Sequence, residues 1–267
     1  KDDYHLVVIT STVMPRSCDE QIVPAIEEAS GKSCGTDFGV GYNPKFIALG
    51  SVARDMLHPD FVLVGESDPK AGEILESIYH NLYEANETPS PVCRMNFVNA
   101  ELTKIAVNTF VTTKISYANM LAGVCEKVPG ADADVVTGAI GLDSRIGKKY
   151  LRGSLPYGGP CFPRDNVAFA TFAREVGADA NVAEATDEIN RLRNVHLEEM
   201  ITARLADGAS VGILGLSYKP NTDVTEVSPG IALAKRLIEK GTSVVVCDLA
   251  AMHNARRELG DSVEYAA

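Results

Sequence analysis

A single thiol lies in a stretch rich in glycine and proline, the sequence YGGPCFPRD at residues 157–165. Glycine and proline fix an irregular backbone, and such a loop can present Cys161 to a cleft. Cysteine is a useful nucleophile only as the thiolate, and nearby positive charge or backbone N–H groups lower its pKa from about 8.5. Asp165 follows four residues later and can orient a water molecule or a base. The residues alone also allow a structural turn around a buried cysteine.

A second set of polar residues lies in a long apolar stretch and comprises Glu101, Lys104 and Asn108. In a helix, Lys104 and Asn108 share one face because they are four residues apart. A cation beside an amide can donate hydrogen bonds to an oxyanion or to a sugar hydroxyl. An ordinary solvated helix face is the alternative for these residues taken alone.

The third candidate is a pair of glycines, Gly212 and Gly215, with Asp248 at the end of a later apolar run. This pattern is weaker than the complete GxGxxG fingerprint of dinucleotide-binding domains, and no GxGxxG occurs near the N-terminus. Glycine turns and an aspartate at a strand end occur in many doubly wound domains. A structural turn and a nucleotide site are therefore equally open.

The first third of the chain alternates between strand and helix patterns. Short apolar runs predict buried strands at 4–10 and 61–65, and apolar residues at helical spacing predict a helix at 18–29. An uninterrupted apolar pattern then predicts one long helix at 100–128, and a second helix is predicted at 182–205. The first of these helices carries Lys104 and Asn108, and the stretch that contains Cys161 lies between the two helices.

The last sixty residues have the pattern of a βαβ unit. A strand at 210–215, a helix at 229–240 and a strand at 243–248 follow one another with glycine breaks between them. We therefore predict a domain boundary near Asp207. The glycine- and proline-rich stretch 152–163, which leads to Cys161, is predicted as a loop.

The composition is that of an ordinary globular protein. The 267 residues are 45% hydrophobic and 23% charged, which excludes disordered and fibrous classes. The 25 Lys and Arg residues face 36 Asp and Glu residues, for a net charge of −11, so no nucleic-acid partner is expected. No apolar stretch approaches the roughly 20 residues that span a bilayer, so no membrane partner is expected.

The cysteines give no sign of a metal site. The chain contains six of them, with no CxxC pair and no histidine at metal-ligand spacing. A chain of this length does not need a disulfide framework, so we expect a reducing, cytoplasmic compartment.

Five segments carry a resemblance over nearly the whole chain. They are ITSTV at 9–13, NPKFIALGSVARD at 43–55, AELTKIAVNTF at 100–110, DSRIGKKYLRGSLPYGGPCFPRD at 143–165 and GLSYKPNTD at 215–223. Their order and spacing resemble the UDP-glucose/GDP-mannose dehydrogenase family. The resemblance favours the functional interpretation of Cys161, Lys104 and Asn108 over the structural alternatives.

The resemblance implies an α/β fold with two Rossmann-like, doubly wound parallel-sheet domains, both incomplete here, joined by a long central helical region. Residues 1–99 would be the remainder of an NAD-binding domain, 100–207 a central helical dimerisation domain with the catalytic loop, and 208–267 the start of a UDP-binding domain. A homodimer through the central helix is expected. On this plan we also expect the segment with GxGxxG and the ribose-binding acid, and the extreme C-terminus, to lie outside this sequence.

The family oxidises the C6 hydroxyl of a nucleotide sugar to a carboxylate, using two NAD⁺ and a covalent intermediate on cysteine. By resemblance, Cys161 is the nucleophile, Lys104 and Asn108 stabilise the oxyanion, and Asp165 assists the attacking water. Thr12 matches a hydroxyl near the reacting end of the sugar. The residues implied in substrate binding are Tyr150, Leu151, Arg152, Ser154, Tyr157, Gly158, Arg145, Lys219 and Phe46, and those implied in cofactor binding are Ser11, Thr12 and Arg164.

The resemblance also implies which substrate to expect. Residues 145–147 and 161–165 resemble the UDP-glucose branch more than the mannose or amino-sugar branches, so UDP-glucose is the first choice and another UDP- or GDP-sugar the alternative. Two motifs depart from the family: carboxylates are replaced at Lys45 and Leu49, and Glu226 stands where an arginine that meets the cofactor diphosphate is expected. A glutamate there would repel phosphate.

These departures keep a rival hypothesis open, a catalytically degenerate dimeric protein that binds nucleotide sugars without turnover. A third hypothesis is a cysteine-dependent aldehyde dehydrogenase of another fold. The four retained chemical groups, Cys161, Lys104, Asn108 and Asp165, favour the enzyme.

Overall fold

The computed structural model describes residues 3–46, 49–83 and 90–266. Ile47 and Ala48, in the segment 43–55 that carries part of the family resemblance, lie outside the described residues. Contacts divide the chain into two units, Lys1–Val107 and Asn108–Ala267. Each unit is described by itself.

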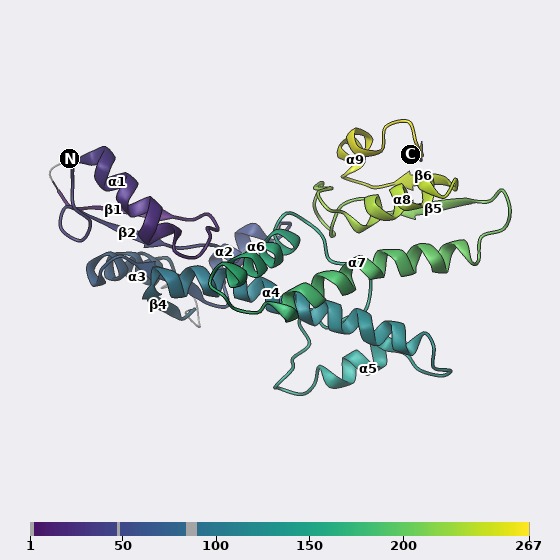
Figure 1. Cartoon of the computed structure of the whole chain (residues 1–267), viewed down its shortest axis with the longest axis horizontal. Coiled ribbons are helices and arrows are strands. Elements are labelled where there is room, and N and C mark those ends of the chain that lie inside the picture. Colours follow the sequence, from purple (N-terminus) through teal and green to yellow (C-terminus); the bar gives the residue numbers. More distant parts are fainter. Residues whose placement is uncertain (1–2, 47–48, 84–89, 267) are drawn as a thin grey trace. The chain divides into compact units, whose positions relative to one another are not determined.

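The first unit contains a four-stranded sheet in the order β1-β2-β3-β4. This unit is the purple to blue part of the ribbon in Figure 1, where β1, β2 and β4 are labelled. Its strands are β1 (His5–Ile9), β2 (Phe38–Tyr42), β3 (Val62–Glu66) and β4 (Val92–Asn96). The β1–β2 and β3–β4 pairs are parallel, as predicted for buried strands of an α/β fold. The β2–β3 pair is antiparallel, so the sheet is mixed at its centre.

Helices pack on this sheet at close range. One turn of π-helix (Cys18–Ile22) leads into α1 (Val23–Ser30), and the short α2 (Val52–Leu57) and α3 (Pro69–Tyr83) follow. A Cβ added to Gly41 of β2 would lie only 2.9 Å from the Leu75 side chain of α3. The glycines of β2 therefore let α3 approach the backbone of this fully buried strand.

The long helix α4 spans Phe97–Cys125, against a predicted span of 100–128. It starts earlier because the side-chain oxygen of Asn96 accepts the backbone N–H of Asn99 at 3.1 Å, which caps the first turn. It ends one turn before Pro129 and Gly130, where Gly130 has a φ of 83°. The prediction of a single long helix is confirmed.

The second unit continues with α5 (Ala133–Ile140), α6 (Phe162–Glu175) and α7 (Asn181–Thr202). The predicted loop at 152–163 ends earlier than expected, because α6 begins at Phe162. Pro163 lies in the first turn of α6, where its missing N–H would have no helical partner in any case. The helix predicted at 182–205 is confirmed as α7.

The predicted βαβ unit is confirmed as β5 (Ser210–Leu214), α8 (Pro229–Glu239) and β6 (Ser243–Cys247). The chain adds α9 (Met252–Leu259) and a short β7 (Glu264–Tyr265), and the strands form a parallel sheet in the order β5-β6-β7. One apolar core holds this part together, with Leu216, Ala234, Leu237 and Val246 fully buried. Across the described residues, no helix combines the length and apolar character needed to cross a membrane.

Candidate functional site

Cys161 is the N-cap residue of α6, at the end of a stretch without regular secondary structure from Leu151. All six cysteines lie in the described ranges, and Cys161 is the exposed one. Cys18, in contrast, is completely buried, and burial together with its contact to Glu101 raises the pKa of its thiol. The position of Cys161 beside the partially positive end of a helix suits an anionic nucleophile.

A carboxylate and an amide lie together next to this thiol. Asp165, one helical turn after Cys161, is buried, and its backbone N–H donates to the Cys161 carbonyl oxygen at 2.8 Å. The Asn108 side chain on α4 donates from Nδ2 to Asp165 Oδ2 at 2.6 Å, and the Arg164 guanidinium lies 3.0 Å from Asp165 Oδ1. The structure therefore brings Cys161, Asp165, Asn108 and Arg164 into one cluster.

Aromatic rings surround the start of α6. Tyr150 and Tyr157 both contact Phe162 edge-on, with ring centroids 6.3 Å apart in each case. The Tyr157 hydroxyl donates to Asp187 and accepts from Asn166, and burial followed by the Asp187 contact raises the pKa of Tyr157. Tyr157 is therefore a fixed, protonated part of the loop.

Residues of the C-terminal segment pack against the same loop. A Cβ on Gly158 would lie 2.0 Å from the Val227 carbonyl oxygen, and one on Gly159 would lie 2.5 Å from the Tyr218 ring. The Gly159 N–H donates to the Glu226 carbonyl at 3.1 Å. The paired glycines were the sequence signal for this close approach, but its partners were not predicted.

The carboxylate of Glu226 and the amine of Lys219 are two charged groups near the cluster, and Glu226 acts on Arg164. Burial acts to lower the pKa of Arg164, but the hydrogen bond to Asp165 and the charges of Asp165, Cys161 and Glu226 outweigh it and raise that pKa. Lys219 follows Tyr218, with its amine 5.7 Å from the centre of that ring. The predicted site residue Lys219 and the unusual Glu226 are thus near the loop at Gly158–Gly159.

Other predicted substrate residues have different surroundings. Leu151 is buried, whereas Ser154 is exposed. The Arg145 guanidinium forms an exposed ion pair with Asp143 at 2.6 Å, and the Arg152 guanidinium lies 3.3 Å from Asp134. None of the described contacts joins Arg145 or Arg152 to the Cys161 cluster.

In the first unit, Lys104 is a buried residue of α4, and its amine lies 4.5 Å from the centre of the Phe46 ring. One turn earlier on the helix, the Glu101 carboxylate is completely buried. It accepts the backbone N–H groups of Arg16 at 2.6 Å and Cys18 at 2.8 Å. Glu101 therefore anchors the segment after β1 to α4 and has a structural role that sequence reasoning missed.

Ser11 and Thr12 follow the carboxyl end of β1, with Ser11 exposed and Thr12 half-buried. In open α/β sheets, dinucleotides bind at the carboxyl ends of parallel strands, and β1 pairs in parallel with β2. Two hydroxyl-bearing residues at this edge fit contacts to NAD.

Lys45 lies at a position where the family often has glutamate. Its amine donates to the Asn43 side-chain oxygen and to the Tyr79 hydroxyl, and burial lowers the pKa of Lys45. Leu49, the second departure in this segment, is exposed. The amine of Lys45 is thus held inside the first unit by neutral polar groups.

Asp248 fits the structural interpretation of the third candidate. Its two carboxylate oxygens accept the backbone N–H groups of Leu216, Ser217, Ala250 and Ala251 at 2.6–3.1 Å. Burial acts to raise the pKa of Asp248, but these four N–H groups outweigh it and hold that pKa at about 2. Asp248 stabilises the turns after β5 and β6.

We expect Asp248→Asn to lower the local stability of β5 and β6 by about 2 kcal/mol at pH 7. The folded pKa lies below the unfolded value, so this stabilisation is present above about pH 4 and is lost as the pH falls toward 2. Native-state hydrogen exchange of the β5 and β6 amides measures it. The difference in amide protection between the variant and the parent protein should be smaller at pH 3. Asp207→Asn, at an exposed aspartate, is the control. Equal protection of these amides in Asp248→Asn and in the parent protein at pH 7 would contradict the structural role of Asp248.

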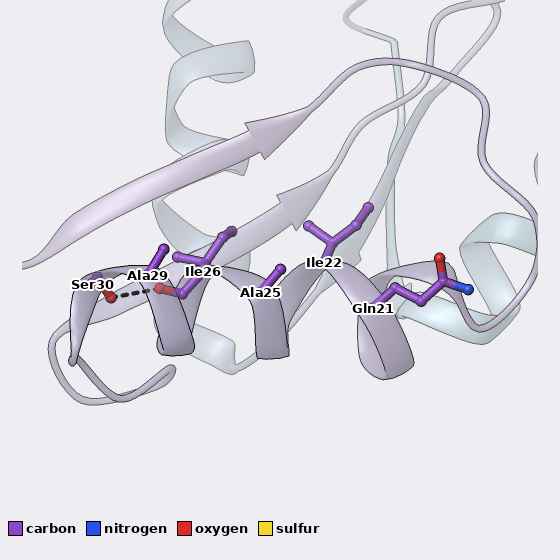
Figure 2. A pocket seen from close by; sticks show the side chains of 6 residues that line it. All are labelled: Gln21, Ile22, Ala25, Ile26, Ala29 and Ser30. Atoms are coloured by element: carbon purple, nitrogen blue, oxygen red, sulfur yellow. Dashed lines mark hydrogen bonds between the residues drawn. The ribbon is translucent and has the colours of Figure 1, made fainter.

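One groove on the described surface holds none of these residues. It is a shallow apolar depression along the π-helix and α1, lined by Gln21, Ile22, Ala25, Ile26, Ala29 and Ser30 (Figure 2). Within the described ranges, no three His, Cys, Asp or Glu side chains gather closely enough to hold a metal ion.

Comparison with family models gives three consecutive matches. Residues 1–83 match the NAD binding domain of the UDP-glucose/GDP-mannose dehydrogenase family, residues 98–192 match its central domain, and residues 212–267 match its UDP binding domain.

Named relatives agree with these matches. UDP-glucose 6-dehydrogenase AglM of Haloferax volcanii is 40% identical over all 267 residues, which cover 61% of that protein. TuaD of Bacillus subtilis, also a UDP-glucose 6-dehydrogenase, is 32% identical over 97% of the chain and 55% of its own length. A UDP-glucose dehydrogenase structure from Pyrobaculum islandicum superposes with a TM-score of 0.90 at 36% identity, over 100% of this chain and 60% of that one. The chain thus spans about three fifths of the length of these relatives.

Proposed function

Because the chain belongs to the UDP-glucose/GDP-mannose dehydrogenase family, we propose that it forms part of an NAD-dependent enzyme that oxidises the C6 hydroxyl of a UDP-sugar to a carboxylate. UDP-glucose is the proposed substrate, since two relatives named UDP-glucose 6-dehydrogenase are 40% and 32% identical to the chain. The observation that carries the proposal is the exposed Cys161 at the N-cap of α6, with buried Asp165 one turn away.

The proposed reaction needs two oxidations, and NAD⁺ supplies the hydride acceptor for each. The first converts the C6 alcohol to an aldehyde. The Cys161 sulfur then adds to the aldehyde carbon, and its proton goes to the new oxygen to give a thiohemiacetal. Loss of a second hydride and a proton gives a thioester on Cys161. Attack by water breaks the carbon–sulfur bond, and the acid and the free thiol are released.

We assign the surrounding roles to residues of the same cluster and of α4. Asp165 takes a proton from the attacking water, and Asn108 holds the Asp165 carboxylate in place through its Nδ2. Lys104 and Asn108 stabilise the oxyanion, and Thr12 lies near the reacting end of the sugar. The substrate is held by Tyr150, Leu151, Arg152, Ser154, Tyr157, Gly158, Lys219, Phe46 and, across a dimer, Arg145; the cofactor contacts are Ser11, Thr12 and Arg164.

Family membership also supports the proposed division into an NAD-binding part at 1–99, a central part at 100–207 and a UDP-binding part at 208–267. It excludes the hypothesis of an aldehyde dehydrogenase with another fold. The rival that remains is a binding protein without turnover. Lys45, Leu49 and Glu226 favour that rival, because they replace groups that the family often has at these positions.

The experiment that separates these possibilities is NADH formation by the intact protein across a panel of UDP- and GDP-sugars. We expect UDP-glucose to give the highest kcat/KM, with two NADH formed per sugar. Preference for a mannose or N-acetylhexosamine derivative would overturn the choice of substrate. Binding of UDP-glucose without NADH formation would overturn the enzyme and favour the binding protein.

We propose a homodimer through α4. Phe110, Tyr117 and Val124 of this helix are seven residues apart, and each is about half exposed or more. Side chains at this spacing form one apolar stripe along the helix, and such a stripe on a charged protein suits an interface with a second copy.

Light scattering at micromolar concentration should therefore give the mass of a dimer. The double variant Tyr117→Asp, Val124→Asp should shift the protein to the monomer, because it places charge in the apolar stripe. Leu249→Asp, at a fully exposed leucine just after β6, is the control and should remain a dimer. A monomeric parent protein would contradict this proposal.

A further inference from the structure

Two asparagines hold the loop that leads to Cys161, and each one does so in the same way. Asn119 on α4 accepts the Ser154 N–H at 2.7 Å and donates to the Leu155 carbonyl at 3.2 Å. Asn190 on α7 accepts the Tyr157 N–H at 2.8 Å and donates to the Tyr157 carbonyl at 3.0 Å. We call these two pairs of hydrogen bonds the Asn119 clamp and the Asn190 clamp.

The clamps replace the backbone pairing that this loop lacks. Residues 151–160 form neither helix nor strand, and Arg152, Ser154 and Leu155 are exposed. A side-chain amide carries one acceptor and one donor group, so it can pair with a backbone N–H and a backbone carbonyl together. Asn119 is buried and Asn190 is half-buried, which protects the bonds from competition by water.

The two clamps hold different parts of the loop. The Asn119 clamp lies at Leu155 and at Ser154, the last of the proposed substrate-binding residues in the run 150–154. The Asn190 clamp lies at Tyr157, four residues before Cys161, and the Tyr157 hydroxyl is also bound by Asp187, three residues before Asn190 on α7. The loop backbone is therefore tied to α4 at Ser154 and Leu155 and to α7 at Tyr157.

We propose that Asn119 and Asn190 are positioning residues, with the Asn119 clamp shaping the substrate-binding run 150–154 and the Asn190 clamp orienting the backbone that presents Cys161. The inference rests on the proposed function, in which Cys161 is the nucleophile. Neither asparagine touches the reacting atoms; each acts through the loop backbone.

The test compares Asn119→Ala and Asn190→Ala with Asn194→Ala. Asn194 is one turn further along α7, and its buried side-chain oxygen makes no hydrogen bond to any residue that the structure describes, so it is a matched control. We expect Asn190→Ala to lower kcat by at least about tenfold with little change in KM. Asn119→Ala should raise KM for the UDP-sugar with little change in kcat. Asn194→Ala should change neither value.

Two measurements need no turnover. Amide hydrogen exchange at Tyr157 should be about tenfold faster in Asn190→Ala, and exchange at Ser154 about tenfold faster in Asn119→Ala. Alkylation of Cys161 by iodoacetamide should change in rate in Asn190→Ala, because the backbone that leads to the thiol is no longer held at Tyr157. Asn190→Asp keeps the acceptor for the Tyr157 N–H but places an oxygen against the Tyr157 carbonyl, so it should resemble Asn190→Ala in kcat.

The outcomes separate this inference from the proposed function. If the parent protein forms no NADH from any sugar, the proposed function fails, and exchange and alkylation still decide whether the clamps hold the loop. The clamps would be overturned if amide exchange in both alanine variants, and alkylation of Cys161 in Asn190→Ala, proceeded at the rates of the parent protein. Faster exchange with unchanged kcat and KM would overturn the positioning role. If an alanine variant does not fold, the corresponding aspartate variant, Asn119→Asp or Asn190→Asp, provides the same comparison.

Discussion

Replacing Cys161 by serine is expected to abolish formation of the acid, with a loss of at least about 10³-fold in kcat. Serine is a favourable N-cap residue, so α6 should form normally in the variant. The loss should therefore reflect the missing sulfur, because a hydroxyl is a much weaker nucleophile and cannot form the thioester. NADH formation from UDP-glucose and release of the uronic acid measure it.

Cys125→Ser is the matched control, because Cys125 ends α4 and is half-buried. It should retain activity close to that of the parent protein. A stricter test adds the C6 aldehyde directly to Cys161→Ser and measures its oxidation. If Cys161→Ser oxidised this aldehyde at the parental rate, Cys161 would not be the nucleophile, since the second hydride transfer proceeds from the thiohemiacetal.

Replacing Lys104 by alanine is expected to lower kcat and kcat/KM together by about 10²-fold or more, and to leave KM nearly unchanged. In the ground state the oxygen on C6 of the sugar is uncharged, whereas negative charge develops on this oxygen during the reaction. Lys104 is buried, and one N–H of the neighbouring Asn108 amide already donates to Asp165. We therefore expect the lysine to contribute most of the charge stabilisation.

Lys127→Ala, at an exposed lysine just after α4, is the control and should leave both constants unchanged. Steady-state kinetics with UDP-glucose at saturating NAD⁺ distinguish a role of Lys104 in stabilising the oxyanion from a role in binding the substrate. A raised KM with kcat intact in Lys104→Ala would make Lys104 an anchor for phosphate or sugar. The oxyanion role would then pass to Asn108 or to backbone N–H groups beside Cys161.

Sequence alone identified the elements whose signals are local. The uninterrupted apolar pattern predicted α4, and the run of glycine breaks around two β-branched segments predicted β5, α8 and β6. The motif around Cys161 indicated a shaped loop, and the structure places Cys161 at its exposed end. Propensity, periodicity and turn chemistry act over a few residues, so each of these features can be read within one short window.

Only the tertiary structure decided what these elements hold in place. Glu101 looked like part of a polar helix face, but it is buried against the segment after β1, and Asp248 caps two turns of the last sheet. The antiparallel β2–β3 pair and the partners of Asn119 and Asn190 were also not predicted. These features join residues that are far apart in the chain. A carboxylate or amide has the same local signal whether it meets water or a backbone 33 residues away, so its role depends on which distant groups folding brings to it.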